Sequence, residues 1–406
     1  MTSTPASISN RPTLTAADTA LAGLPVEVGD TIEGCRRLRE PWLRMRERCG
    51  VQSPNTDPDR FVAVVGALPD ALPHVVMFGS RESPRALLVA RSSRRRVAYR
   101  LGYTGFRSPT LRCLDVVYEG LLTDTFPGFL PLVVAYLTRR LRRGDFDLVS
   151  FNHLRLAQAQ YLTNRSTSAV ADEPEPHWRF ELLPGSCEQS IQPFSKKHRY
   201  NIRRADRLLV DFFGGKVCLR AFTSAGEVDD FLSRAAQITA QSYQGRLKIG
   251  LRNDRVTREA LCADARAGRL RCYWLEANTE PIAHQVGYID GDAYHLAATS
   301  FLPQYGRLSP GQVLLVRVIE DLSTIGVRCI DYGFGDADYK RIYGTESWPE
   351  QSVRLYGRTA RATLARMLDV ATTRGAAWLR TAAEQLGAIR RIKNTWRRRL
   401  TRDHGR

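Results

Sequence analysis

The segment DYGFGDADYKRIYG, residues 331–344, follows directly on an apolar run that has the composition of a buried strand. Polar and aromatic side chains crowd a glycine-rich turn here, at the position where an α/β sheet opens a crevice. Gly333 and Gly335 allow a ligand to approach the backbone closely, and Asp336 is placed to cap a following helix. The spacing matches neither the dinucleotide-binding nor the Walker motif. We therefore predict a ligand-facing loop, with a surface ion cluster as the plainer alternative.

Around this loop the second half of the chain alternates between helical and strand-like patterns. Strands are predicted at 216–222, 270–277, 281–289, 293–299, 328–332 and 352–356. Helices are predicted at 194–209, 224–241, 257–268 and 310–325. The last of these has Pro310 at its start and Gly326 just past its end, which is the expected asymmetry of a helix.

The first half has a similar but weaker pattern. Strands are predicted at 61–65, 75–78, 86–90, 97–101, 111–122 and 146–151, with a helix at 127–143 and a linker or long loop at 166–177. Residues 111–153 and 295–332 share one order of strand, loop, helix and strand, which indicates a duplicated module. We expect four parts: a flexible arm at 1–25, a degenerate module at 26–180, a catalytic module at 181–357 and a basic helical tail at 358–406.

The composition is that of a globular protein with a strong positive charge. The chain has 406 residues, 43% of them apolar, and a formal net charge of +18. These values exclude an acidic disordered chain, a collagen-like chain and a disulfide-stapled miniprotein. Residues 354–406 hold 14 basic and 3 acidic side chains, a net +11. Such a charge predicts contact with phosphates, nucleic acid or an anionic membrane surface.

Cysteine spacing and apolar runs bear on the compartment. The eight cysteines form no C-x-x-C pair and lie mostly in apolar runs, which predicts reduced core thiols and no metal site. The N-terminal residues lack the pattern of a secretory signal. The most apolar stretch, 126–141, is too short to span a bilayer. We expect a cytoplasmic protein.

Two further segments have the character of anion-binding sites. One is the helix start RLSPGQ at 307–312, where free N–H groups and the helix dipole favour an anion, although ordinary capping by Ser309 explains it equally well. The other is the predicted helix at 194–209, where Lys196, Arg199 and Arg203 fall in one stripe. Like charges four residues apart are unfavourable by roughly 0.2–0.5 kcal/mol per pair, so the stripe suggests an anionic partner, with a solvated face as the alternative.

At this point the second half resembles a known family. The helix at 195–207, the run WLE…PIAH at 274–284, SPG…LL at 309–315 and DYGFGD…YK at 331–340 are similar, in this order, to the CelD-like group of GNAT-superfamily acyltransferases. The FemAB-type transferases are more distant relatives. The resemblance implies a mixed, mostly antiparallel sheet flanked by helices, as two tandem GNAT-like modules with a C-terminal amphipathic helix. The loop at 307–312 departs from the Gln/Arg-x-x-Gly-x-Gly/Ala pattern of standard GNAT enzymes.

The resemblance also implies roles for individual residues. Acetyl-CoA or another acyl-CoA would be bound at the start of the helix at 310, by Arg307, Ser309, Gly311 and Gln312. The acceptor side would be formed by Lys196, Arg199, Arg203, His284 and Lys340. Asp336 or Asp338 would act as base, and Tyr339 as an acid toward the leaving thiolate. A structural role for His284, and for His295 on the neighbouring predicted strand, is the plainer interpretation.

The resulting hypothesis is a CoA-dependent N- or O-acyltransferase for a sugar, polysaccharide or cell-envelope precursor. The first alternative is a FemAB-like transferase that uses aminoacyl-tRNA, and the second is a non-catalytic protein that binds a membrane or polyanion. Nucleic acid other than tRNA is not expected as a partner. Leu364, Met367 and Trp378 recur at helical spacing in the tail, which predicts peripheral contact with the inner face of an anionic membrane or with another polyanion. A helix packed on the domain, with an arginine-rich end, is the plainer alternative.

Overall fold

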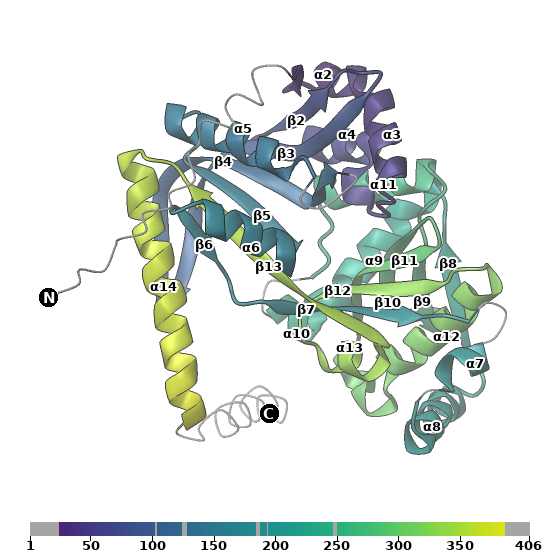
Figure 1. Cartoon of the computed structure of the whole chain (residues 1–406). Coiled ribbons are helices and arrows are strands. Elements are labelled where there is room, and N and C mark those ends of the chain that lie inside the picture. Colours follow the sequence, from purple (N-terminus) through teal and green to yellow (C-terminus); the bar gives the residue numbers. More distant parts are fainter. Residues whose placement is uncertain are drawn as a thin grey trace, which may run out of the picture.

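The chain folds around one continuous mixed sheet of 13 strands, seen in a computed structural model (Figure 1). The structure describes residues 24–101, 104–123, 128–183, 187–192, 194–246 and 250–385. The order across the sheet is β1-β2-β3-β4-β5-β13-β7-β12-β11-β10-β9-β8, with β6 paired to β13. The first half of the chain therefore occupies one end of the sheet, and the second half occupies the other.

The first half supplies seven strands and most of the helices that cover them. Its strands are β1 (Val26–Gly29), β2 (Ala71–Gly79), β3 (Pro84–Leu101), β4 (Thr104–Thr123), β5 (Leu148–Arg155), β6 (Ala169–Ala171) and β7 (Glu175–Glu181). Its helices are α2 (Ile32–Arg37), α3 (Arg39–Arg48), η1 (Pro54–Thr56), α4 (Pro58–Ala67), α5 (Leu130–Arg143) and α6 (Leu156–Arg165).

The second half repeats this succession. Its strands are β8 (Val217–Phe222), β9 (Cys272–Ala277), β10 (Glu280–Asp290), β11 (Ala293–Phe301), β12 (Cys329–Phe334) and β13 (Glu346–Tyr356). Its helices are α7 (Cys187–Ile191), α8 (Lys196–Phe212), η2 (Ala225–Glu227), α9 (Val228–Gln241), α10 (Tyr243–Arg246), α11 (Arg255–Arg266), η3 (Pro303–Leu308), α12 (Pro310–Thr324), α13 (Asp338–Tyr343) and α14 (Ala360–Gln385).

The two halves have the same strand pairing. From β1 to β4, and again from β8 to β11, neighbouring strands are antiparallel. In both halves the next pair is parallel, β4 with β5 and β11 with β12. A helix, α5 or α12, makes the crossover between these parallel strands. The predicted mixed, mostly antiparallel sheet with a duplicated module is confirmed.

The halves exchange their last strands. β7, from the end of the first half, pairs antiparallel with β12 of the second half. β13, from the end of the second half, pairs antiparallel with β5 and with β6 of the first half. β7 and β13 also pair with each other and so join the two ends of the sheet. The predicted module boundary at 180/181 lies inside β7.

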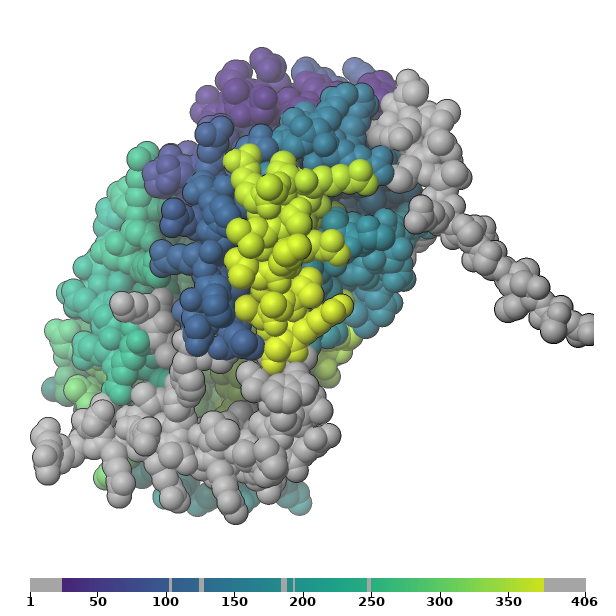
Figure 2. Space-filling view, turned by 90° about the vertical axis from the view of Figure 1, so that its left-hand side faces the viewer, coloured from purple at the N-terminus to yellow at the C-terminus, as the bar shows by residue number. Residues whose placement is uncertain are grey.

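Helices cover both faces of the sheet. In the first half, α5 and α6 pack on one face over a core that includes Phe78, Leu88 and Phe151. The helices α2 to α4 pack on the other face, over Trp42, Val75 and Leu87. Beside these helices α14 lies along β3 and β4, and Figure 2 shows it as the yellow helix on that side of the molecule.

A network of ion pairs joins the halves between α4 and α11, which contact each other extensively. Asp264 of α11 is fully buried, and its Oδ2 accepts a hydrogen bond from Arg60 Nε of α4 at 2.9 Å. Arg269 reaches Asp57, the N-cap of α4, at 3.0 Å. Because α4 and α11 contact each other directly, they lie on the same face of the sheet. Their ion pairs fix the two halves against each other.

Two local predictions are wrong. Residues 61–65, predicted as a strand, lie in α4, because Phe61 and Val65 are one helical turn apart and both face the core. Residues 166–177, predicted as a linker, contain β6 and the start of β7. These short strands pair with β13, which the sequence pattern of a linker did not indicate.

The tail begins as a regular helix. Ala362 and Ala365 of α14 are fully buried, whereas Leu364 and Met367 are 48% and 63% exposed. The apolar stripe predicted from Leu364 therefore faces away from the domain. Trp378 and the tail beyond it, like most of the predicted arm at 1–25, lie outside the side chains that the structure describes. Among the described residues no helix is long and apolar enough to cross a membrane.

Candidate active site

The sheet splays open between β11 and β12. These strands pair only at residues 293–295 and 329–331, although β11 continues to Phe301 and β12 to Phe334. One extra residue, Ala297, bulges from β11 opposite the step from Val286 to Gly287. Bulges of this kind turn a strand away from its neighbour. The result is a gap at the carboxyl end of β12, where the loop at 331–344 begins.

The start of α12 lies beside this gap. Ser309 adopts a left-handed conformation with φ of 54°, and among the described residues its side chain caps no helix N–H group. A Cβ on Gly311 would lie 3.1 Å from the Phe301 ring, so the end of β11 packs tightly on this turn. Burial raises the pKa of Tyr343, and the Gln312 side chain opposes this shift, so Gln312 faces α13. Arg307 lies in η3 just before the turn. An uncapped helix start of this kind favours a bound anion.

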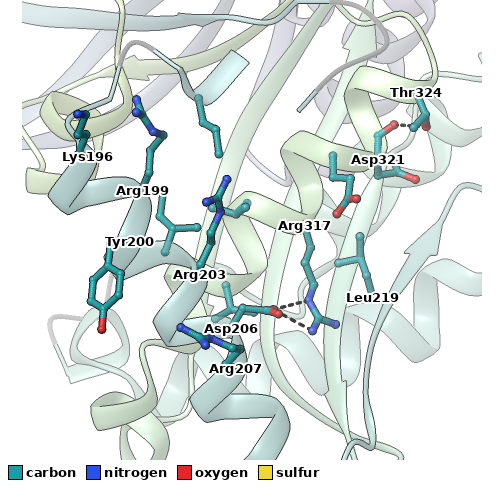
Figure 3. A pocket seen from close by; sticks show the side chains of 15 residues that line it. Lys196, Arg199, Tyr200, Arg203, Asp206, Arg207, Leu219, Arg317, Asp321 and Thr324 are labelled. Carbon is teal, nitrogen blue, oxygen red and sulfur yellow. Dashed lines mark hydrogen bonds and ion pairs between the residues drawn. The ribbon is translucent and has the colours of Figure 1, made fainter. Parts of the chain in front are cut away.

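A groove of about 1280 Å³ runs along α12 between this helix and α8 (Figure 3). Lys196, Arg199 and Arg203 line it from α8, together with Arg207. Arg203 reaches Glu188 at 2.6 Å, whereas Lys196 and Arg207 make no hydrogen bond or ion pair with a described residue. The predicted cationic stripe thus forms one wall of a groove that starts at the first turn of α12.

The loop at 331–344 splits into exposed and buried parts. Asp336 and Asp338 both pair with Arg341 at the surface, so the predicted acidic pair forms an ion cluster. Tyr339 packs edge-on against Tyr332, and burial raises its pKa to about 12. Lys340 donates to the Phe334 carbonyl at 2.6 Å. Burial lowers the pKa of Lys340 to about 8, although the negative charges of Asp331 and Glu175 act in the opposite direction.

A buried polar cluster lies where the exchanged strands meet. His177 of β7 is 1% exposed, and its Nε2 lies 2.8 Å from Asp331 Oδ1 of β12. Its Nδ1 lies 3.2 Å from Glu350 Oε2 of β13. Tyr118 of β4 and Trp348 both donate to Glu350, at 3.1 and 2.8 Å. The cluster therefore draws its members from both halves of the chain.

The charges in this cluster depend on one another. Burial alone would lower the pKa of His177, but hydrogen bonds to Asp331 and Glu350 outweigh it and raise the pKa to about 9. Burial alone would likewise raise the pKa of each carboxyl, and the interaction with His177 lowers both. At neutral pH the cluster is an imidazolium between two carboxylates.

Glu119 lies next to this cluster in an unusual backbone. Residues 117–120 bulge from β4 opposite Val89 alone, and Glu119 has φ of 56°. Burial, together with the like charges of Asp331 and Glu350, raises the pKa of Glu119 to about 7. The positive charges of His177 and Arg155 oppose this shift but do not outweigh it. Its carboxyl group forms no hydrogen bond or ion pair with a described residue. Such a strained, unpartnered acid is typical of functional sites.

The two predicted histidines are separated in the structure. His284 is fully buried, and its Nε2 lies 2.8 Å from the Thr239 hydroxyl. Burial lowers its pKa to about 3, so it is a neutral core residue. It pairs with Ser300 across the sheet, and not with His295. His295 stacks on Tyr288 close to Asp331.

Sequence reasoning missed His177, Glu350, Tyr118 and Glu119. His177 and Glu350 sit in segments rich in proline and charge, and only the strand exchange makes these segments central. Asp331 is the first residue of the loop at 331–344, and the sequence pattern assigned it no role. The signal that was available is the pair of acidic residues, Asp147 and Asp331, at matching places in the repeat.

Known proteins show the same kind of domain. Residues 196–341 match the family model described as an acetyltransferase (GNAT) domain. Over residues 196–341 the chain has the fold of a GNAT acyltransferase domain. The predictions of the superfamily and of an acyltransferase are confirmed at this level. The match spans α8, the splayed strands and most of the loop at 331–344. The buried cluster draws His177, Glu350 and Tyr118 from strands outside the matched residues.

Solved structures share the fold over most of the chain. FemX is 8% identical, with a TM-score of 0.53 over 76% of this chain and 93% of that one. The C-terminal domain of a putative lysylphosphatidylglycerol synthetase from Agrobacterium fabrum is 12% identical, with a TM-score of 0.50 over 83% and 97%. At such identities the likeness concerns the fold. The search of curated proteins gave no match.

Proposed function

We propose that this GNAT protein transfers an acyl group from acyl-CoA to an amine or hydroxyl of a sugar, polysaccharide or cell-envelope precursor. One observation carries the proposal: the α8–α12 groove, with basic side chains on its α8 wall, reaches Val313 on α12, one turn past the uncapped helix start beside the splayed strands. A phosphate-bearing donor with a long thin arm fits this combination of a charged groove and a narrow gap.

The residues present are suited to hold CoA. The turn at Ser309 and Gly311 would take the pyrophosphate, with Arg307 and Gln312 beside it, because helix N–H groups at an uncapped start attract anions. Lys196, Arg199, Arg203 and Arg207 offer positive charge for a further phosphate. CoA supplies the activated acyl group as a thioester.

The reaction then requires one nucleophile and one proton transfer. The acceptor nitrogen or oxygen forms a bond to the acyl carbon, the carbon–sulfur bond breaks, and the acceptor proton passes to a base while the thiolate takes up a proton. Glu119 is better placed as the base than Asp336 or Asp338, because its pKa near 7 suits proton transfer at neutral pH. Tyr339 and Lys340 border the gap as candidate acids toward the thiolate.

A second donor is supported by a specific likeness. The fold is similar to that of FemX, and the cationic groove would suit an aminoacyl-tRNA as well as CoA. In that case an ester bond at the tRNA end replaces the thioester, and the acceptor side is unchanged. A purely binding role would not explain the raised pKa of Glu119 or the separation of β11 from β12.

Titration calorimetry on the full chain tests the donor. Acetyl-CoA, a longer acyl-CoA and an aminoacyl-tRNA are compared, with wild type and the Lys196→Gln/Arg207→Gln variant. We expect CoA binding that weakens at least tenfold in the variant. The matched control is Arg96→Gln/Arg107→Gln, which removes the same charge from exposed sites in the other half. Binding of tRNA alone would favour the second donor, and binding of neither would reject both.

A further inference from the structure

One face of the first half-sheet has a stretch that neither α4 nor α14 covers. A cavity of about 560 Å³ begins at Leu68, just past α4. A second cavity, of about 590 Å³, reaches Asp369 of α14. Both are lined by Val97, Ser352 and Arg354, so they form one continuous groove, here called the N-half groove.

The end of the N-half groove near α4 is basic. Arg91 and Arg94 of β3 line it, and neither makes a hydrogen bond or ion pair with a described residue. Arg95 also lines it and binds Asp115 at 2.7 Å. The Ser93 hydroxyl between them is buried and has no partner among the described side chains and backbone. Two unneutralised guanidinium groups beside a free hydroxyl are a suitable environment for a phosphate group.

In the middle of the groove one arginine is bound by two carboxylates, so this part is slightly acidic. Arg354 Nε lies 2.6 Å from Asp369 of α14, and Arg354 Nη1 lies 2.8 Å from Asp172 of the β6–β7 loop. Because one guanidinium binds both walls, α14 and this loop are held at fixed positions along the groove.

The far end of the groove is acidic and meets the catalytic loop. Glu175 is exposed there and forms no hydrogen bond or ion pair with a described residue. Glu350 of the buried cluster lines the same end. His153 stacks on Phe334 with ring centroids 3.4 Å apart, which gives a flat aromatic floor. Phe334 belongs to the loop at 331–344, and its carbonyl holds Lys340.

The N-half groove also lies on the correct face of the sheet. It borders α4, and α4 shares its face with α11. The α8–α12 groove lies on the other face, because α8 and α12 cover a core distinct from the one under α9 and α11. A donor bound at α12 and an acceptor in the N-half groove would therefore reach the splay from opposite sides.

From this arrangement we infer that the N-half groove binds the acceptor, and that the acceptor has a phosphate at one end and a primary amine at the other. The phosphate lies at Arg91 and Arg94, and the amine lies at Glu175, which is paired across the sheet with Glu350 beside the splay. Glu350 and Arg354 are four residues apart on β13, so the two groups are separated by more than about 13 Å. The inference rests on the proposed acyl transfer for its chemistry, but its binding test does not.

Inorganic pyrophosphate is the first probe, in titration calorimetry with the full chain. Arg91→Gln/Arg94→Gln removes the basic end, Lys196→Gln/Arg207→Gln alters the α8–α12 groove, and Arg96→Gln/Arg107→Gln is the charge-matched control. We expect the first variant to lose one class of sites at least tenfold in affinity, while the second retains that class. Wild-type binding by the first variant would overturn the inference. Loss of CoA binding by the second variant would test only the proposed donor site.

A second pair of probes tests the acidic end. An alkyl phosphate with a terminal amine is compared with the same alkyl phosphate lacking the amine. We expect the amine to strengthen binding severalfold in wild type, and Glu175→Gln to remove this gain while binding of the plain alkyl phosphate stays the same. Equal binding of both probes to wild type would rule out an amine site at Glu175.

Discussion

His177 and Asp331 lie 2.8 Å apart at the centre of the sheet, although 154 residues separate them in the chain. His177 ends up beside Asp331 because β7 leaves the first half and pairs with β12. Glu350, on the strand exchanged in the other direction, contacts the second nitrogen of the same ring. The buried cluster is thus a product of the strand exchange, and its charge state reports on the integrity of both halves.

Folding stability should fall at alkaline pH through His177. Its pKa rises from 6.5 to about 9 on folding, so its contribution is fully present below pH 6.5 and is lost as the pH rises through 9. His177→Gln should lower stability near pH 7 by about 3 kcal/mol, because it leaves two buried carboxylates without a counter-charge. Thermal denaturation between pH 6 and 9.5 should show a flatter alkaline limb for the variant. Parallel curves for the two proteins would contradict this account.

The ionised form of Glu119 should lower the free energy of unfolding, and Glu119 should be necessary for turnover. Its pKa rises from 4.5 to about 7 on folding, so the folded state loses stability relative to the unfolded chain as pH increases toward 7. Glu119→Gln should therefore raise stability at pH 8 by roughly 1–2 kcal/mol and reduce turnover by about 10²-fold. Glu47→Gln, at an exposed position on α3, is the control. A stabilised variant that keeps full turnover would exclude Glu119 as the base.

The ion pair between Arg60 and Asp264 should be strongly coupled. Asp264 is fully buried, so removal of Arg60 leaves a carboxylate whose remaining ion-pair partner among the described residues is Arg269. A double-mutant cycle with Arg60→Leu and Asp264→Leu should give a coupling free energy of about 2 kcal/mol or more. Arg258 and Asp229 form an exposed pair, at 46% and 67%, and should give less than about 1 kcal/mol. Similar values for both pairs would mean that burial does not strengthen the contact between halves.

Gly311 should be needed for the donor and hardly at all for the fold. A Cβ at this position would press on the Phe301 ring at 3.1 Å, so Gly311→Ala should shift the turn at the start of α12. We expect CoA binding to weaken about tenfold with a loss of roughly 1 kcal/mol in stability. Gly226→Ala is the control, since a Cβ there meets nothing within 4 Å. A variant that binds CoA normally would place the pyrophosphate elsewhere.

The exposed stripe of α14 should contribute to membrane contact. Leu364 and Met367 face away from the domain, so Leu364→Glu/Met367→Glu should reduce partition to anionic vesicles severalfold and leave stability unchanged. Leu72→Glu/Ile325→Glu changes two comparably exposed residues elsewhere and should have no effect. Removal of residues 375–406 should abolish vesicle binding and spare turnover on a soluble acceptor. Unchanged partition of all variants would leave α14 as a purely structural helix.

Local sequence patterns predicted what depends on local structure. The helix at 310 with its proline and glycine, the strands at 270–299 and the cationic stripe on α8 were all predicted within a few residues. The duplicated order also followed from the sequence, because each copy repeats the same succession of periods. The prediction of a strand at residues 61–65 was wrong because three valines and a phenylalanine suit a buried helix face as well as a strand.

The centre of the site could not be predicted in the same way. His177 and Glu350 become neighbours through strands that cross between halves, and no local period encodes that crossing. Asp336 and Asp338 looked catalytic because they sit in a glycine-rich loop, but Arg341 three to five residues later neutralises both at the surface. Glu119 depends on a four-residue bulge whose partner strand lies elsewhere in the sequence.

The crossing of β7 and β13 makes the chain resemble an exchanged dimer whose two subunits share one polypeptide. A gene cut between residues 180 and 181 would give each product a strand that fits only the other, and would leave β5 and β12 with unpaired edges. The two fragments should therefore aggregate when made separately and recover when made together. Duplication of an ancestral module with this exchange would have kept both copies dependent on one another from the outset.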